Sequence, residues 1–312
     1  MLKQNIQTIT AFAPATSANL GVGFDIMGLA LAAVGDKVTL TKRNDGKIVI
    51  EKINSTTGLP LEPHKNTASY ALTKMCEELK ISCGFSMQID KGIAMGSGMG
   101  GSAASAVAAV VALNGFLTQP VSKEKLVEFA LYGEEIASGG KHADNVAPSV
   151  FGGITLIRDT QPMDIITLPS PAELLCVIIH PHLQVETKSA RGILSPTVSM
   201  SDFVHQSANL AATISALYTN DMSLLKRSML DLIIEPQRAQ LVTGYFDVKK
   251  AALASGAITA TLSGSGPSLI AFAINQDSAH KVCNAMIEAF KQHNIEADSW
   301  ISPINPHGAY II

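Results

Sequence analysis

The sequence has little net charge, few cysteines and no long apolar run. Its 312 residues carry a formal net charge of −3, and Lys, Arg, Asp and Glu are scattered along the chain. No basic face for a nucleic-acid partner is therefore expected. The longest predominantly apolar stretch, 103–113, is shorter than the ~20 residues that span a bilayer. We expect neither a nucleic-acid partner nor a membrane partner.

The cysteines and the first residues indicate the compartment. The cysteines are Cys76, Cys83, Cys176 and Cys283, and they form no CxxC pair. Free thiols in a reducing compartment are the expectation. The first ten residues, MLKQNIQTIT, lack the apolar core of a signal peptide. A cytoplasmic location is therefore expected.

The first half of the chain is predicted to alternate short strands and helices. Asn44-Asp45-Gly46 predicts a hairpin, because Asp-Gly supplies the positive φ angles of a tight turn. Ser122 is a suitable N-cap for the helix that follows it. The predicted strands are 6–13, 37–42, 47–52, 85–89 and 150–157, and the predicted helices are 66–80, 102–116 and 123–137.

The second half has a different pattern. The segment 173–179 is continuously apolar after Glu173, which is typical of a buried strand, and Gly256 can end a short helix in a left-handed conformation. The other predicted strands are 258–262, 269–274 and 297–301, with helices at 202–218, 221–233, 247–255 and 278–293. This order matches the ferredoxin-like split βαβ pattern with additional helices.

These patterns predict an α+β fold of two domains. Domains usually have ~100–200 residues, and 47% of this chain is hydrophobic, enough for two cores. Three prolines fall within 161–171, which favours a boundary there. We expect an N-terminal domain at 1–165 and a C-terminal domain at 166–312.

The segment 14–25, PATSANLGVGFD, combines small residues, two glycines, an amide and a carboxylate in a predicted turn after the first strand. One interpretation is a loop held by local side-chain hydrogen bonds. The other is that Asn19 and Asp25 face a cleft and hold a polar substrate. Asp25 suits an ammonium or hydroxyl group.

A glycine-rich run, GSGMGGSAAS at 96–105, precedes an Ala- and Val-rich helix. Its glycines let backbone N–H groups approach an anion, and the helix N-terminus adds positive charge. The run also fits the dinucleotide fingerprint GxGxxG, but Glu124, near the required distance, opens a second helix. No Gly-Lys-Ser/Thr of a Walker A loop is present. A phosphate-binding loop of a third kind remains, with Ser102 able to offer a hydroxyl to Mg²⁺.

Two further segments are rich in polar groups. The first has Glu134 on a helix, followed by His142, Asp144 and Asn145 in a predicted loop. His-x-Asp resembles a metal site, but without other ligands nearby hydrogen-bonding roles are favoured, and Asp144 could serve only as an N-cap or turn former. The second, LSGSGPS at 262–268, has more glycines and hydroxyls than a hairpin needs. That excess suggests close packing against a ligand or against the glycine-rich run.

In this order, the four segments resemble the GHMP kinases over essentially the whole chain. PATSANLGVGFDIMGLAL and HADNVAPSVFGG, with VETKSAR at 185–191 and EPQR at 235–238, are similar to the members that phosphorylate homoserine. The resemblance implies an N-terminal domain like domain 2 of ribosomal protein S5, a ferredoxin-like C-terminal domain and an active site between them. It also implies ATP-dependent phosphorylation of the L-homoserine side-chain hydroxyl, a step of threonine biosynthesis, and is compatible with a homodimer.

The resemblance assigns roles to particular residues. The ATP phosphates would lie on Met95, Gly96, Ser97, Gly98, Met99, Gly100, Gly101, Ser102 and Ala103, with Ser102 and Glu134 holding Mg²⁺. Homoserine would contact Asn19, Asp25, His142, Asn145, Thr187, Arg191 and Arg238. Arginine suits the carboxylate because its planar fork pairs bidentately.

The proposed catalytic residues are Glu134, Asp144 and Asn145. Asp144 matches a candidate base of mevalonate-type relatives by its distance from the Gly-Gly pair. The homoserine-phosphorylating members are thought able to act without a base, so Asp144 is either a base or a residue that organises the loop.

The sequence departs from the family pattern at three positions. Ala94 stands where proline is usual, Gly101 where a second serine is usual, and Val22 where proline is common. These changes would affect the loop or the affinity for nucleotide, but they remove no charged or metal-binding group.

Three alternatives remain. Another GHMP kinase, acting on a sugar or an isoprenoid acid, would not require Arg191 and Arg238 together. A non-catalytic ligand sensor on the same fold is disfavoured by the presence of Ser102 and Glu134. A nicotinamide dehydrogenase is disfavoured by the context of the glycine-rich run.

Overall fold

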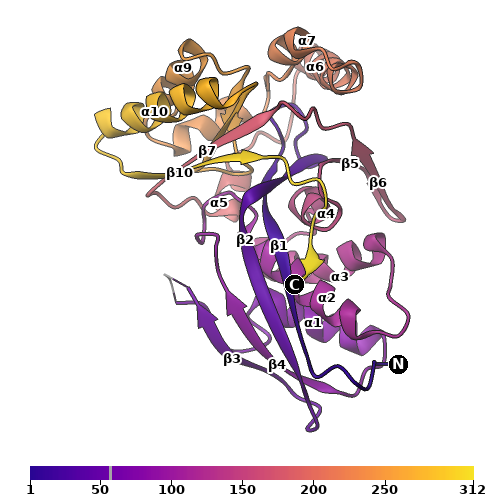
Figure 1. The fold of residues 1–312 in the computed structure, drawn as a ribbon. Helices are drawn as coiled ribbons and strands as arrows, with labels where there is room; N and C mark the ends of the chain where they lie inside the picture. Colours follow the sequence, from indigo (N-terminus) through magenta and orange to yellow (C-terminus); the bar gives the residue numbers. More distant parts are fainter. Residues whose placement is uncertain (56–57) are drawn as a thin grey trace.

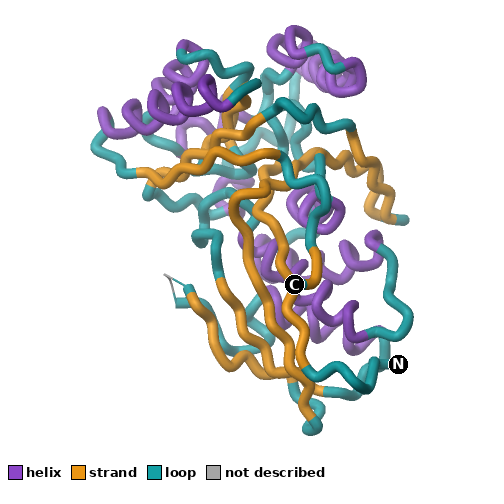
Figure 2. The backbone as a smooth tube through the Cα atoms, in the orientation of Figure 1, coloured by secondary structure: helices purple, strands orange, loops and turns teal. Residues whose placement is uncertain are grey.

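The computed structural model describes residues 1–55 and 58–312. The chain up to Leu168 forms most of one sheet with its helices, in the lower part of Figure 1. Apart from a short strand at 310–311 that joins the first sheet, the remainder forms a second sheet with its own helices in the upper part, coloured from rose through orange to yellow. Figure 2 shows the long strands of the first sheet running toward the second part.

The first sheet has seven strands, in the order β11-β1-β2-β4-β3, with β5 paired to β2 and β6 paired to β5. Their bounds are β1 Thr8–Ala18, β2 Met27–Arg43, β3 Ile48–Asn54, β4 Gly84–Asp90, β5 Ile154–Thr160, β6 Met163–Leu168 and β11 Tyr310–Ile311. The chain thus returns to its first strand at its end.

The predicted hairpin of 37–42 with 47–52 is wrong. β4 lies between β2 and β3, antiparallel to β2 and parallel to β3. The local signal itself is present, because Gly46 has φ 69° and the Asp45 carboxylate accepts hydrogen bonds from Arg43. A turn signal identifies where the chain reverses, but not which strand becomes the neighbour.

Four helices pack on the first sheet: α1 Thr67–Glu78, α2 Gly101–Phe116, α3 Lys123–Ser138 and α4 Ala143–Phe151. The first three match their predictions closely, and Ser122 caps α3 by accepting a hydrogen bond from the Lys125 N–H. Ala103–Leu113 of α2 is buried throughout, because small Ala and Val side chains let α2 lie between α1, α3 and β1. This helix fixes where the glycine-rich run ends.

Two predictions at the polar segments need correction. Strand β1 continues to Ala18, so the first part of 14–25 is strand and Asn19 stands at its end. The predicted loop at 142–145 begins helix α4, and the strand predicted at 150–157 starts only at Ile154. Pro148 inside α4 and Gly152 just after it hid the helix in the sequence, since both residues usually mark breaks.

The second sheet has the order β10-β7-β9-β8, the ferredoxin-like arrangement. Its strands are β7 Leu175–Pro181, β8 Ala260–Leu262, β9 Leu269–Ala273 and β10 Ala297–Pro303. One face packs on α9 Tyr245–Ala254 and α10 Gln276–Gln292, and the other joins the core shared with the first sheet. Successive side chains of β7 point alternately to these two faces, and both faces are buried. This explains the apolar run at 174–179.

The remaining helices of this part are α5 Thr187–Gly192, α6 Met200–Thr219, α7 Met222–Ser228, α8 Glu235–Arg238 and the 3-10 turn Ala239–Leu241. Helix α7 is shorter than the predicted 221–233. Gly256 follows α9 with φ 99°, as expected for a helix end.

The segment 161–171 contains β6, so the first sheet extends to Leu168. The boundary at 165/166 stays a prediction. All four cysteines are free. Among the helices in the described part of the chain, none has the length and apolar character needed to cross a membrane.

Candidate active site

A cleft of about 560 Å³ is lined by segments from both parts of the chain. The predicted site residues on its wall are Asn19, Asp25, Met95, Gly96, Ser97, Gly98, Gly100, Gly101, Ser102, Glu134, His142, Asp144, Asn145, Thr187, Arg191 and Arg238. Met99 and Ala103 lie outside this lining, and both are buried (1% and 0% exposed).

The glycine-rich run passes three times through left-handed backbone before α2 begins. Gly96, Gly98 and Gly100 have φ angles of 67°, 77° and 66°, which glycine adopts without strain. Gly100 is the N-cap of α2, and the first turn of α2 contains no acidic residue. The positive end of this helix therefore borders the cleft and suits an anion such as phosphate.

The second glycine-rich loop, 262–268, packs against the first. Ser263 Oγ donates to Gly98 O at 2.8 Å, and the Ser268 N–H donates to Ser97 O at 3.2 Å. A Cβ at Gly98 would lie 2.5 Å from Ser263 O, so only glycine permits this approach. Of the two explanations for the extra glycines and hydroxyls, packing against the first loop is confirmed.

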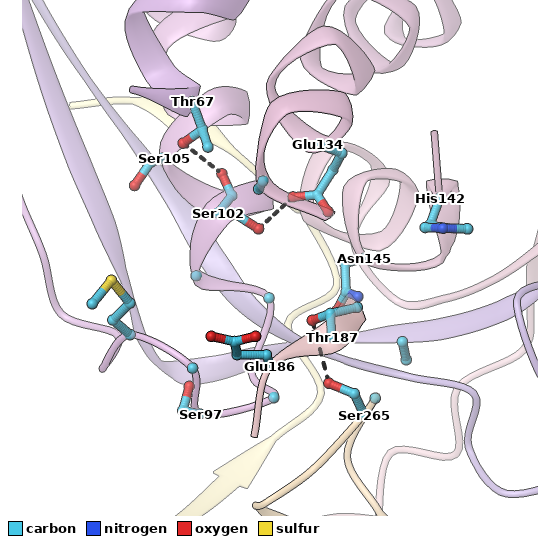
Figure 3. A pocket seen from close by; sticks show the side chains of 18 of the residues that line it. Thr67, Ser97, Ser102, Ser105, Glu134, His142, Asn145, Glu186, Thr187 and Ser265 are labelled. Atoms are coloured by element: carbon cyan, nitrogen blue, oxygen red, sulfur yellow. Dashed lines mark hydrogen bonds between the residues drawn. The ribbon is translucent and has the colours of Figure 1, made fainter. Parts of the chain in front are cut away.

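Ser102 and Glu134 meet at the wall of the cleft, as the dashed line in Figure 3 shows. Ser102 Oγ, in the first turn of α2, donates to Glu134 Oε1 on α3. Glu134 is buried, and burial raises the pKa of its carboxyl, while the hydrogen bond from Ser102 opposes that shift. A hydroxyl and a carboxylate oxygen side by side are the ligand types that Mg²⁺ prefers.

Asp25 and Arg191 form a bidentate ion pair at the charged part of the cleft. The Arg191 Nη1 and Nη2 atoms lie 2.9 and 2.7 Å from the two carboxylate oxygens. His142 Nδ1 is 3.9 Å from the same carboxylate. Burial, and then the charge of Arg191, lower the pKa of His142. The structure therefore joins two residues for which the sequence suggested separate substrate groups.

Arg238 is almost fully buried at 3% exposed, yet it lines the cleft. Its Nε donates to Ala190 O at 3.1 Å and its Nη1 to Gly264 O at 3.4 Å. In the described part of the chain it forms no ion pair within 4.0 Å. Burial and the neighbouring Arg191 lower its pKa. A buried cation without a carboxylate partner favours an anionic ligand.

The amide side chains are held by the backbone and by hydroxyls. Asn19 Nδ2 donates to Gly264 O at 2.9 Å, and its Oδ1 accepts from the Asp25 N–H. Asn145 Oδ1 accepts from Thr16 Oγ1 at 2.8 Å. Asn19 thus links the first strand to the 262–268 loop.

Thr187 and His142 come from opposite parts of the chain. Thr187 Oγ1 lies 3.4 Å from Ser265 Oγ, as the dashed line in Figure 3 shows, and both Thr187 and His142 line the cleft.

Asp144 lies in the first turn of α4 and is 4% exposed. Burial, followed by the negative charges of Asp25 and Glu134, raises the pKa of its carboxyl to about 7. Its Oδ1 has no hydrogen-bond partner in the described structure. It is not the N-cap of α4, which is His142. A buried carboxyl that titrates near neutral pH and has a free oxygen suits proton transfer.

Two family models match parts of this chain, and relatives match nearly its whole length. The GHMP kinases N terminal domain matches residues 66–153, and the GHMP kinases C terminal domain matches 213–292. A homoserine kinase of Chlorobium phaeobacteroides is 42% identical, covering 98% of this chain and 100% of the relative. The chain belongs to the GHMP kinase family.

Solved structures agree with this membership. The crystal structure of homoserine kinase from Cytophaga hutchinsonii has a TM-score of 0.95 and 42% identity, covering 100% of this chain and 99% of that one. Among the relatives compared by sequence, a homoserine kinase of Xanthomonas campestris is 39% identical over 99% of this chain and 95% of the relative. The mevalonate kinase of L. major, at 16% identity and TM-score 0.76 over 98% and 99% of the two chains, shares the fold. Family membership implies the use of ATP.

The sequence analysis missed one buried network in this GHMP kinase. Lys91 forms an ion pair with Asp36, and its Nζ also donates to Gly101 O at 2.8 Å and Ser105 Oγ at 2.9 Å. A Cβ at Gly101 would lie 3.2 Å from Ile93 Cγ2 and 3.5 Å from Lys91 Nζ. The glycine that departs from the family pattern thus lies where Lys91 approaches the start of α2. An isolated Asp and Lys, 55 residues apart in the sequence, gave no signal of this contact.

Proposed function

We propose that this chain phosphorylates the side-chain hydroxyl of L-homoserine with ATP, giving O-phospho-L-homoserine for threonine biosynthesis in the cytoplasm. The observation that carries the proposal is the composition of one cleft. It combines a helix N-terminus with a Ser–Glu pair at one part and Asp25, Arg191 and Arg238 at another. A phosphate donor and a small zwitterion can therefore bind in the same cleft.

The phosphates of ATP would lie against the backbone of 96–102 and the first turn of α2. Ser102 and Glu134 would hold Mg²⁺, which commonly takes one or two protein oxygens together with phosphate oxygens. In keeping with this, the described residues contain no group of three or more His, Cys, Asp or Glu suited to a metal ion. When bound, Mg²⁺ would neutralise charge on the phosphates.

Homoserine carries a carboxylate, an ammonium group and a hydroxyl, and the cleft has a partner for each. Arg191 and Arg238 would bind the carboxylate and Asp25 the ammonium, so the bound state replaces the Asp25–Arg191 pair. Asn19 and Asn145 would direct the hydroxyl. Thr187 and His142 would complete the polar wall.

Asp144 would accept the hydroxyl proton on its carboxylate as the homoserine oxygen bonds to the γ-phosphorus and the bond to ADP breaks. The unpartnered Oδ1 and a pKa of about 7 support this role over one of loop organisation. Positioning by the arginines and amides would supply the rest of the rate enhancement.

A coupled ADP-release assay across homoserine, mevalonate and galactose tests the proposal. Turnover with homoserine alone is expected. Turnover with mevalonate or galactose but not homoserine would replace the substrate by that of another GHMP kinase. ATP binding without turnover of any of them would make the chain a sensor.

A homodimer is the proposed assembly. Helix α6 exposes Met200, Phe203, Val204 and Tyr218, and 203–219 contains no Lys, Arg, Asp or Glu. An uncharged exposed face of this kind is suited to a symmetric contact, because like charges would not meet across the two-fold axis. Light scattering of the intact chain tests this assembly.

A further inference from the structure

Phe24 contacts both arginines of the charged part of the cleft. The Arg191 Cζ lies 5.3 Å and the Arg238 Cζ 5.0 Å from the centre of the Phe24 ring. The ring is half-buried and does not belong to the cleft lining. The ring therefore contacts both guanidinium groups from outside the cleft lining.

Two like charges close to one aromatic ring require compensation. Arg238 is buried, its hydrogen-bond acceptors among the described residues are backbone carbonyls, and burial and Arg191 both lower its pKa. The negative face of an aromatic ring attracts a guanidinium, most strongly where water is excluded. Since the same ring contacts both cations, neither can move away without losing that attraction.

Phe24 and Asp25, which are adjacent in the sequence, both contact Arg191. Asp25 has φ 63°, so the backbone turns sharply there, and its carboxylate meets the edge of the Arg191 guanidinium while Phe24 contacts the same group as a cation–π pair. A substrate ammonium on Asp25 would compete with the Arg191 ion pair. The Phe24 contact does not compete, because the ring lies outside the cleft lining.

We propose that Phe24 is a positioning residue that keeps Arg191 and Arg238 together as one carboxylate-binding site. The proposal rests on the proposed homoserine site. A ring outside the cleft lining would then set the affinity for the substrate's carboxylate through its contacts with the two arginines.

The test compares Phe24→Leu with Phe24→Tyr. Leucine keeps apolar bulk but removes both cation–π contacts, so the KM for homoserine should rise about 5- to 30-fold, equivalent to about 1–2 kcal/mol. Tyrosine keeps the ring and should restore KM to within about twofold of wild type. The KM for ATP should stay near the wild-type value in both variants.

Phe246→Leu serves as the matched control, because Phe246 is on α9 and 67% exposed. It should leave the KM for homoserine unchanged. An unchanged KM in Phe24→Leu would overturn the proposal, as would an equal rise in both KM values together with a lower Tm, which would indicate a general structural role.

Different results would contradict the proposed function and the proposed role of Phe24. If the wild-type protein does not phosphorylate homoserine, the function is wrong. If wild type is active and Arg238→Ala impairs homoserine binding while Phe24→Leu does not, only the role of Phe24 is wrong.

Discussion

Replacing Arg238 by alanine tests the identity of the substrate. Arg238 is 3% exposed and forms no ion pair within the described part of the chain, so a substrate carboxylate would be its first full counter-charge. Removing one partner of a buried charged pair typically costs ~2–5 kcal/mol, or roughly 30- to several-thousand-fold in binding. The kcat/KM for homoserine should therefore fall at least ~30-fold, and the KM for ATP should change far less.

Homoserine amide identifies which group Arg238 binds. Initial rates with acid and amide should differ strongly in the wild-type protein and less in Arg238→Ala, because the variant has lost one of the two arginines proposed to bind the carboxylate. Melting curves serve as the control for folding. The variant loses a buried, uncompensated charge but also the Arg238 hydrogen bonds to the carbonyls of Ala190 and Gly264, of which Gly264 O keeps its bond from Asn19 Nδ2, and these two effects on the stability of the free protein oppose each other. If acid and amide lose equally, the arginine is structural and the assignment of homoserine loses its main support.

Three further predictions concern the phosphate-binding and catalytic parts. Glu134→Gln should fold normally and lower kcat by orders of magnitude; near-normal turnover with an unchanged Tm would remove Glu134 from the metal site. In Asp144→Asn the rise of kcat/KM with pH near 7 should disappear. The pKa of Asp144 is about 7 in the folded state and ~3.9 in the unfolded state, so the free energy of unfolding should decrease as the pH rises from ~4 to ~7, and it should decrease less in the variant. An unchanged dependence of kcat/KM on pH in the variant would contradict a catalytic base. Gly98→Ala should lower Tm and raise the KM for ATP more than Gly96→Ala. Both positions have left-handed backbone, but only at Gly98 would a Cβ lie within 3 Å of the opposing loop; equal effects would show that the contact between the loops is unimportant.

Local signals in the sequence predicted most elements because their causes are local. Ser122 caps α3 through a bond to an N–H three residues away, and Gly256 ends α9 through its own backbone freedom. The prediction of a hairpin was wrong because β3 pairs with β4, and helix α1 separates these two strands in the sequence. Helix α4 was not predicted because Pro148 lies inside it, and a proline within a sequence pattern usually marks a break in the helix.

The candidate site was identified by residue type, but its pairings were not. Asn19 bonds to a carbonyl 245 positions away, and Lys91 reaches an aspartate across 55 residues. No local pattern encodes such contacts, since the first depends on how the two parts of the chain meet and the second on which strands become neighbours in the first sheet. The contact of Phe24 with Arg191 and Arg238 could not be predicted for the same reason, because these residues are far apart in the sequence.

The ion pair between Asp25 and Arg191 gives the cleft a means of selecting its substrate. Homoserine offers an anion to Arg191 and a cation to Asp25, so it can separate the pair and leave both charges compensated. An isoprenoid acid would satisfy the arginine but leave the aspartate without its partner, and a neutral sugar would satisfy neither. Because an uncompensated, partly buried charge costs free energy, such a ligand must either leave the pair intact or bind more weakly. Selection against other GHMP substrates would then arise from the pair that the free protein already forms.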